Sequence, residues 1–183
     1  AGRIVAIGEL DPAAAGETVE ALGLHVLPGV IDTQVHFREP GAEHKEDLEH
    51  GLKGAALGGV TAVFEMPNTL PLTTDAERLA DKIERAGANA ACDFAFYVGA
   101  TPDNVGDLAA LERRPGCCGV KIFMGSSTGD LLIEDDETLR AVLENGSRRV
   151  AVHAEDENRL RERFAIAEVP LARSPRSMAS SAM

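Results

Sequence analysis

Residues 32–41 read DTQVHFREPG and directly follow the apolar pair Val30 and Ile31. An apolar run that leads into a histidine, an arginine and a Pro-Gly turn is typical of a buried strand that ends at a loop. In barrel enzymes such strand ends carry the active site, because the scaffold aims their side chains rigidly into one mouth. The stretch therefore favours an α/β fold with a functional site at the carboxyl ends of its strands.

The same strand-loop-helix order recurs along the chain from Val30 onward. Strands are expected over residues 30–36, 60–66, 93–98, 118–123 and 149–153. Apolar residues between them recur at helical spacing, and this alternation predicts βαβ units with a parallel sheet. A closed (β/α)8 barrel takes about 250 residues. We therefore predict an α/β chain that contains a partial TIM-type barrel, made of the first five βα units.

The two ends of the chain differ from this middle part. Residues 1–28 contain two short apolar runs, 3–8 and 24–27, around a polar loop. We interpret the two runs as strands and residues 1–28 as part of a small β-sandwich domain. Residues 29–164 form the expected partial barrel. Residues 165–183 are rich in Ser, Arg, Met and Ala without an apolar period, and we expect an irregular tail there.

The charge and the hydropathy of the chain exclude several classes of binding partner. A net charge of −12 and a pI near 4.8 argue against binding to nucleic acid or to an anionic membrane. No apolar run approaches the roughly 18–20 residues of a membrane-spanning helix, and no leader-like segment begins the chain. Three cysteines without a CxxC spacing fit core positions in a reducing compartment. We expect a cytoplasmic protein that acts on a small molecule.

Three residues at the ends of expected strands are candidate metal ligands. His36 and His153 follow the first and fifth strands, and neutral imidazole is a common ligand of transition metals. A hydrogen-bonded structural role is the alternative for each histidine. Lys121 lies among apolar residues of the fourth strand, where its ammonium group either reaches the rim or has a lowered pKa. A neutral lysine that reacts with CO2 becomes a carbamate, so Lys121 is also the candidate catalytic residue.

Two further side chains are candidates for binding the substrate. The planar guanidinium of Arg38 can hold a carboxylate through two hydrogen bonds. An ion pair of Arg38 with Glu39 or Asp32 is the alternative. Asn68 follows the second strand, where it either adds a donor to the same anion or shapes the turn.

On these residues the chain resembles the dihydroorotase family of the amidohydrolase superfamily. The similarity extends from residue 1 to about 160, and its most specific pieces are PGVID at 28–32 and HFREPG at 36–41. The stretches 59–68, 120–124 and 152–155 agree with it as well. Hydantoinases and allantoinases share the strand-end histidines, whereas an arginine followed by Glu-Pro-Gly is more similar to dihydroorotases.

The resemblance implies a (β/α)8 barrel with a small β-sandwich built from both chain ends. It also implies one or two zinc ions and a hydroxide that attacks the ring amide of dihydroorotate, in pyrimidine biosynthesis. By the resemblance, His36 binds the first metal, carbamylated Lys121 bridges both metals and His153 binds the second. Arg38 and Asn68 then hold the substrate carboxylate.

The chain departs from this pattern at one ligand. Gln34 stands where the family usually has the first histidine of a His-x-His pair. An amide oxygen is a weaker zinc ligand than imidazole, so we expect a weak first metal site and little activity from this part of a barrel. Two alternatives stay open. One is an inactive homologue with a structural role, which forms a homo-oligomer or binds a pyrimidine-pathway enzyme. The other is a hydantoinase or an allantoinase.

Overall fold

A computed structural model of the chain describes residues 2–125 and 131–167. Its centre is a parallel sheet of five strands in the order β1-β2-β3-β4-β5. The strands are β1 (Val30–Val35), β2 (Val60–Glu65), β3 (Asp93–Gly99), β4 (Cys117–Phe123) and β5 (Val150–His153). Each bound lies within one residue of the expected one. The prediction of a partial barrel with five βα units is confirmed.

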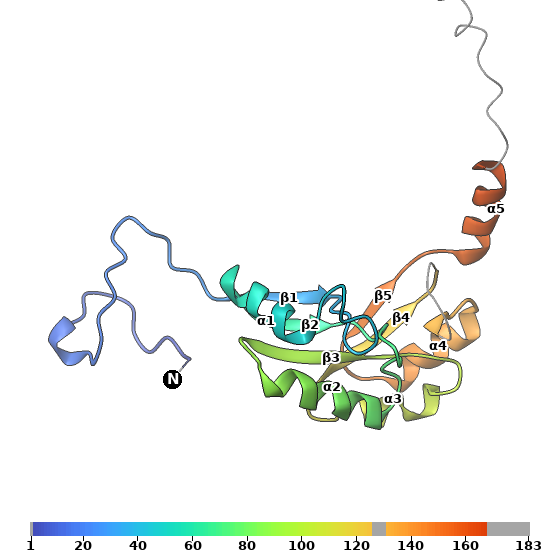
Figure 1. Cartoon of the computed structure of the whole chain (residues 1–183), viewed down its shortest axis with the longest axis horizontal. Helices are drawn as coiled ribbons and strands as arrows, with labels where there is room; N and C mark the ends of the chain where they lie inside the picture. The colour runs from blue at the N-terminus through green and yellow to red at the C-terminus, as the bar shows by residue number, and fades with distance from the viewer. Residues whose placement is uncertain (1, 126–130, 168–183) are drawn as a thin grey trace, which may run out of the picture.

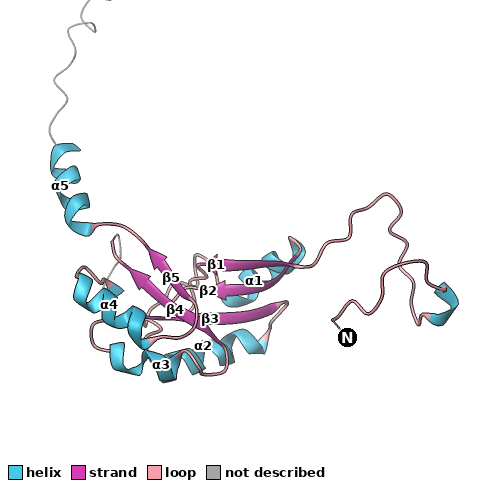
Figure 2. Ribbon diagram, turned by 180° about the vertical axis from the view of Figure 1, so that it is seen from behind, coloured by secondary structure: helices cyan, strands magenta, loops and turns pink. Residues whose placement is uncertain are grey.

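A helix follows each strand; those between consecutive strands pack mainly on one side of the sheet, whereas the last one extends away from it (Figures 1 and 2). They are α1 (Leu48–Leu57), α2 (Ala76–Ala88), α3 (Leu108–Leu111), α4 (Asp136–Asn145) and α5 (Glu157–Ala167), with short 3-10 helices η1 (Pro12–Ala14) and η2 (Val105–Asp107). The side chains of Asp47, Asp75 and Asp135 accept a backbone N–H bond at the start of α1, α2 and α4. These N-caps satisfy amide groups that a helix cannot bond internally, so the sequence sets the helix starts locally.

The sheet has two different faces. The face toward the helices holds the main core, in which Phe96 and Val98 of β3 pack with Leu52 and Leu79. The opposite face holds a smaller cluster of Met66, Tyr97 and Cys118 with partly buried Phe64, Ala95 and Ala151. In a (β/α)8 barrel this second face lines the interior. It is the concave side of the half-barrel.

A bulge in β4 changes which side chains reach the concave face. The pairing with β3 shifts by one residue at this point, where Gly119 has a φ of 152°. Cys118 belongs to the concave cluster, whereas Val120 and Ile122 belong to the core under the helices. By strand alternation Lys121 then faces the concave side as Cys118 does, although the two are three residues apart.

Residues 2–28 form no strand in this structure. They contain only η1, and their large apolar side chains are exposed, among them Ile4, Val5, Ile7, Leu24 and Val26. The expected strands at 3–8 and 24–27 are therefore wrong here, because a strand needs a partner to bond its backbone and none lies beside this segment. The assignment of residues 1–28 to a sandwich domain stays a prediction.

The far end of the chain is helical up to the last described residue. Residues 165–167 belong to α5 rather than to an irregular tail, and the rest of the expected tail lies outside the described residues. Across the described ranges, no helix has both the length and the hydropathy to span a bilayer.

Candidate active site

The end of β1 is joined to the loop after β2 by one side-chain contact. His36 is half-buried, and its Nδ1 lies 2.8 Å from Oδ1 of Asn68. An amide oxygen only accepts hydrogen bonds, so Nδ1 of His36 carries the proton and Nε2 keeps its lone pair. Burial lowers the pKa of His36, and the positive charges of Arg38 and Lys121 lower it further, against the opposing effect of the Asn68 bond. The imidazole is thus held neutral, as a metal ligand must be.

Lys121 and His153 lie on the same face of the sheet, toward the same edge. Lys121 is 3% exposed, and its Nζ lies 4.7 Å from the ring centroid of Phe123. Phe123 pairs with His153 in the β4–β5 ladder, and their rings stack with centroids 6.1 Å apart. Burial lowers the pKa of Lys121, which favours the neutral amine that carbamylation requires. Lys121 and His153 therefore face the same concave surface, two ladder positions apart.

Arg38 stands in the loop between β1 and α1. It is half-buried, and its backbone N–H donates to Glu46 O over 3.0 Å. Within residues 2–125 and 131–167, Arg38 makes no ion pair, whereas Glu39 pairs with Arg85 of α2. The ion-pair alternative for Arg38 is therefore not what this structure shows. Its role in binding a carboxylate stays a prediction.

Few side-chain atoms near the carboxyl ends of the strands can bind a metal ion. Among the described residues, no group of three or more His, Cys, Asp or Glu side chains is placed to hold a metal ion. His36 and His153 supply two imidazoles, although Nε2 of His153 lies 3.1 Å from Oε2 of Glu155. Lys121 adds an oxygen donor only as a carbamate. Gln34 of β1, two residues before His36, is exposed and offers an amide oxygen.

One buried group near the site was not predicted from the sequence. Lys82 of α2 and Glu65 of β2 form an ion pair in which each side chain is 1% exposed. Lys82 Nζ also donates to Met66 O over 3.2 Å and lies 4.9 Å from the Phe96 ring centroid. Burial raises the pKa of Glu65 to about 7 despite the nearby charge of Lys82. The burial of Lys82 could have been inferred from the sequence, because Lys82 lies between the apolar residues Leu79 and Ala86 on one helix face.

Comparison with known proteins identifies this arrangement. Residues 23–127 match the family model described as Dihydro-orotase-like. The chain belongs to this family. Over 160 residues it is 41% identical to an allantoinase of Rubrobacter xylanophilus, and over 159 residues it is 38% identical to a dihydroorotase of Methanosarcina mazei. Each alignment covers 85% of this chain and 35% of the relative, so this Dihydro-orotase-like chain spans about a third of their length.

A solved structure shares the fold. The L-hydantoinase of Arthrobacter aurescens superposes with a TM-score of 0.75 and 30% identity, over 86% of this chain and 37% of that one. The family and the partial barrel are thus confirmed. Relatives named allantoinase and dihydroorotase occur at similar identities. Family membership alone therefore does not identify which cyclic amide is the substrate.

Proposed function

We propose that the gene product containing this chain is a metal-dependent hydrolase of cyclic amides, with dihydroorotate and N-carbamoyl-aspartate as its substrate pair. One observation carries the proposal. Lys121 and His153 share the concave face near one edge of the sheet, and a neutral His36, whose pKa the Lys121 charge lowers, stands at the end of β1. Site residues at strand ends of a barrel are where this fold places its chemistry.

The residues present suit a metal in part. His36 Nε2, His153 and a carbamate on Lys121 are the donors that would hold it, and the amide of Gln34 is the weak member. A bound zinc ion would supply an acidified water and polarise the ring carbonyl. The protein's own part is to keep His36 neutral through burial and the Asn68 bond, and to bury the Lys121 amine.

Arg38 supports the choice of ring. Dihydroorotate carries a carboxylate that hydantoin and allantoin rings lack. A guanidinium without an ion-pair partner among the described residues is available for such a group, and two parallel hydrogen bonds fix its orientation. The NH2 group of Asn68 is a second donor on an amide whose oxygen already bonds His36. We assign both residues to the substrate carboxylate.

The proposal is tested by assaying the purified gene product with dihydroorotate, hydantoin and allantoin. We expect hydrolysis of dihydroorotate to exceed that of the other two, to vanish after chelation and to return with added Zn2+. Hydrolysis that survives complete chelation would contradict the metal dependence. A preference for allantoin or hydantoin would replace dihydroorotate as the substrate.

Gln34 favours a second candidate function, that of an inactive homologue with a structural role. A protein that binds no zinc and hydrolyses none of the three rings, yet forms a stable oligomer or binds a pyrimidine-pathway enzyme, would support it. In either case we place the protein in the cytoplasm, and immunolocalisation tests this.

A further inference from the structure

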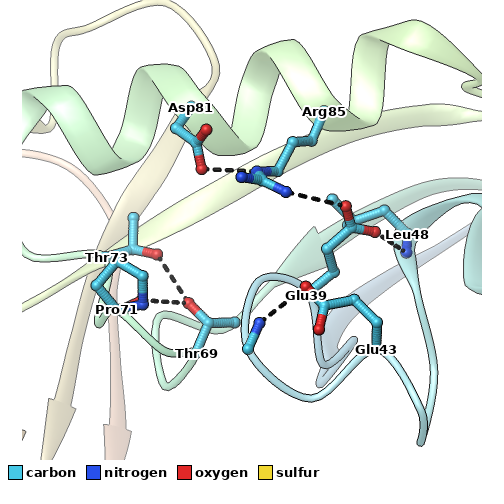
Figure 3. A network of polar contacts seen from close by, with 9 residues as sticks. Glu39, Glu43, Leu48, Thr69, Pro71, Thr73, Asp81 and Arg85 are labelled. Atoms are coloured by element: carbon cyan, nitrogen blue, oxygen red, sulfur yellow. Dashed lines mark hydrogen bonds and ion pairs between the residues drawn. The ribbon is translucent and has the colours of Figure 1, made fainter.

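Glu39 follows Arg38 directly, and both of its carboxylate oxygens have partners. Oε2 accepts the backbone N–H of Leu48, the first residue of α1, over 2.9 Å. Oε1 lies 3.5 Å from a terminal nitrogen of Arg85, whose Nε donates to Asp81 over 2.7 Å. Figure 3 shows Glu39 with dashed lines to Arg85, on α2, and to Leu48. The carboxylate thus links the loop after β1 to both α1 and α2.

Glu39 adds to the capping of α1, because the Leu48 N–H is one of the free amides at the start of that helix. Asp47 already serves as the N-cap of α1 and accepts the backbone N–H of His50 over 2.7 Å. Glu39 comes from outside the helix, nine residues before Leu48. Its bond therefore adds a connection between a distant loop and the helix. A charged acceptor makes a stronger hydrogen bond than a neutral one, so the connection is a firm one.

The loop that Glu39 holds is the one that carries Arg38. The backbone N–H of Arg38 donates to Glu46 O over 3.0 Å, and Arg38 O accepts from Ala42 N over 2.8 Å. Leu70 N donates to Pro40 O over 3.0 Å, which ties this loop to the one that carries Asn68. An added Cβ at Gly41 would lie 2.5 Å from Leu70 O, so the two loops are in close contact. The Leu70 N–H therefore reports on a displacement of the Glu39 loop, whereas the Asn68 side chain is bonded separately to His36.

We infer that Glu39 is a positioning residue that sets the place of Arg38 and thereby the preference for substrates with a ring carboxylate. The inference rests on the proposed function, in which Arg38 binds that carboxylate. Glu39 itself contacts α1 and α2, so it acts through Arg38 and touches no substrate. A guanidinium displaced by a fraction of an ångström loses one of its two parallel bonds, and a site for carboxylates then discriminates less.

The test uses Glu39→Ala and Arg85→Met, with Arg78→Met as a matched control. Arg78 lies on the same helix, is exposed to a similar degree and pairs with Asp75 as Arg85 pairs with Asp81, but it does not reach Glu39. Amide hydrogen exchange of this chain is measured for Arg38 and Leu70. We expect exchange at both to accelerate at least about tenfold in Glu39→Ala, less in Arg85→Met and not in Arg78→Met, because local opening sets these rates.

The second readout is the kinetics of the gene product on two rings. For Glu39→Ala we expect KM for dihydroorotate to rise about fivefold with kcat changed less than twofold, and no change on a carboxylate-free ring, since one charged hydrogen bond is weakened. Arg85→Met should raise KM for dihydroorotate by a smaller factor. Glu39→Gln keeps an oxygen acceptor, so its KM should lie between those of Glu39→Ala and the unaltered protein. Arg85→Met keeps the test open if Glu39→Ala does not fold.

The outcomes separate the inference from the function it builds on. Equal losses on both rings, or unchanged exchange at Arg38 and Leu70, would overturn the positioning role of Glu39. If the gene product hydrolyses no cyclic amide, the proposed function fails and the exchange rates alone decide whether Glu39 holds this loop. Accelerated exchange with an unchanged ratio of rates on the two rings would also overturn the inference.

Discussion

Nδ1 of His36 lies 2.8 Å from Oδ1 of Asn68, so a residue after β2 fixes the tautomer of a histidine after β1. The bond leaves Nε2 of His36 as the atom able to bind a metal. The contact also places two predicted site residues side by side, although 32 positions separate them in the sequence. It gives Asn68 a role beside the substrate contact expected of it.

The first prediction concerns this tautomer. Asn68→Ala removes the acceptor, so we expect the neutral His36 ring to populate both tautomers in place of the single form with Nδ1 protonated. The measurement is the 15N chemical shifts of the His36 ring nitrogens at a pH where the ring is neutral. Asn89→Ala, at the exposed C-cap of α2, is the control and should leave the His36 shifts unchanged. A single unchanged tautomer in Asn68→Ala would contradict the role given to this bond.

The second prediction concerns Gln34 and zinc. Gln34→His restores an imidazole two residues before His36, and we expect it to raise the zinc content of the dialysed gene product. Metal is measured by mass spectrometry of the protein after dialysis. Lys53→His adds a histidine at an exposed position of α1, on the helix side of the sheet, and should add no zinc. If the unaltered protein already holds two equivalents, Gln34 is not the weak ligand.

The third prediction uses the buried Glu65–Lys82 pair. The pKa of Glu65 is raised from 4.5 to about 7, so between these values the folded protein binds more protons than the unfolded chain. The contribution of Glu65 to the free energy of unfolding therefore falls as pH rises from about 4.5 to 7. Glu65→Gln removes this titration and should flatten that part of the curve. Urea unfolding of this chain at several pH values measures it.

A control for that curve is available on the surface. Glu49→Gln removes a glutamate paired with Lys53 at an exposed position of α1, where ion pairs contribute little. We expect its curve to run parallel to that of the unaltered chain. Parallel curves for Glu65→Gln as well would show that Glu65 keeps an ordinary pKa in the folded state.

Much of the fold is readable from local sequence, for physical reasons. Each strand is a short apolar run that ends at a turn, and each longer helix begins at an aspartate that caps its free amides. The signals sit within a few residues of the element that they specify. This is why the five strands are predicted to within one residue, and why His36, Lys121 and His153 are found at or near strand ends.

The rest depends on contacts that local sequence does not specify. The bulge at Gly119 turns both Cys118 and Lys121 to the concave face, and simple alternation along β4 would have separated them. Glu65 and Lys82 look like surface charges until their elements pack together. The strands expected in residues 1–28 fail for the same reason, because a strand forms only beside a partner.

The last prediction addresses Arg38, on which the choice of dihydroorotate rests. A bidentate bond from a guanidinium to a carboxylate in a partly dry site is worth roughly 1.5–3 kcal/mol. Arg38→Met should therefore lower kcat/KM for dihydroorotate about ten- to a hundredfold, and activity on carboxylate-free rings should change far less. Arg38→Lys keeps the positive charge but lacks the two parallel donors of the guanidinium. Its kcat/KM for dihydroorotate should lie between that of the unaltered protein and that of Arg38→Met.

The most direct test is to measure kcat/KM of the gene product and of Arg38→Met on dihydroorotate and on hydantoin. We expect about a ten- to a hundredfold loss on dihydroorotate, which corresponds to the roughly 1.5–3 kcal/mol of the lost contact, and a far smaller loss on hydantoin. An equal loss on both rings would mean that Arg38 supports the fold or the metal site, and it would contradict the assignment of a carboxylate-bearing ring as the substrate.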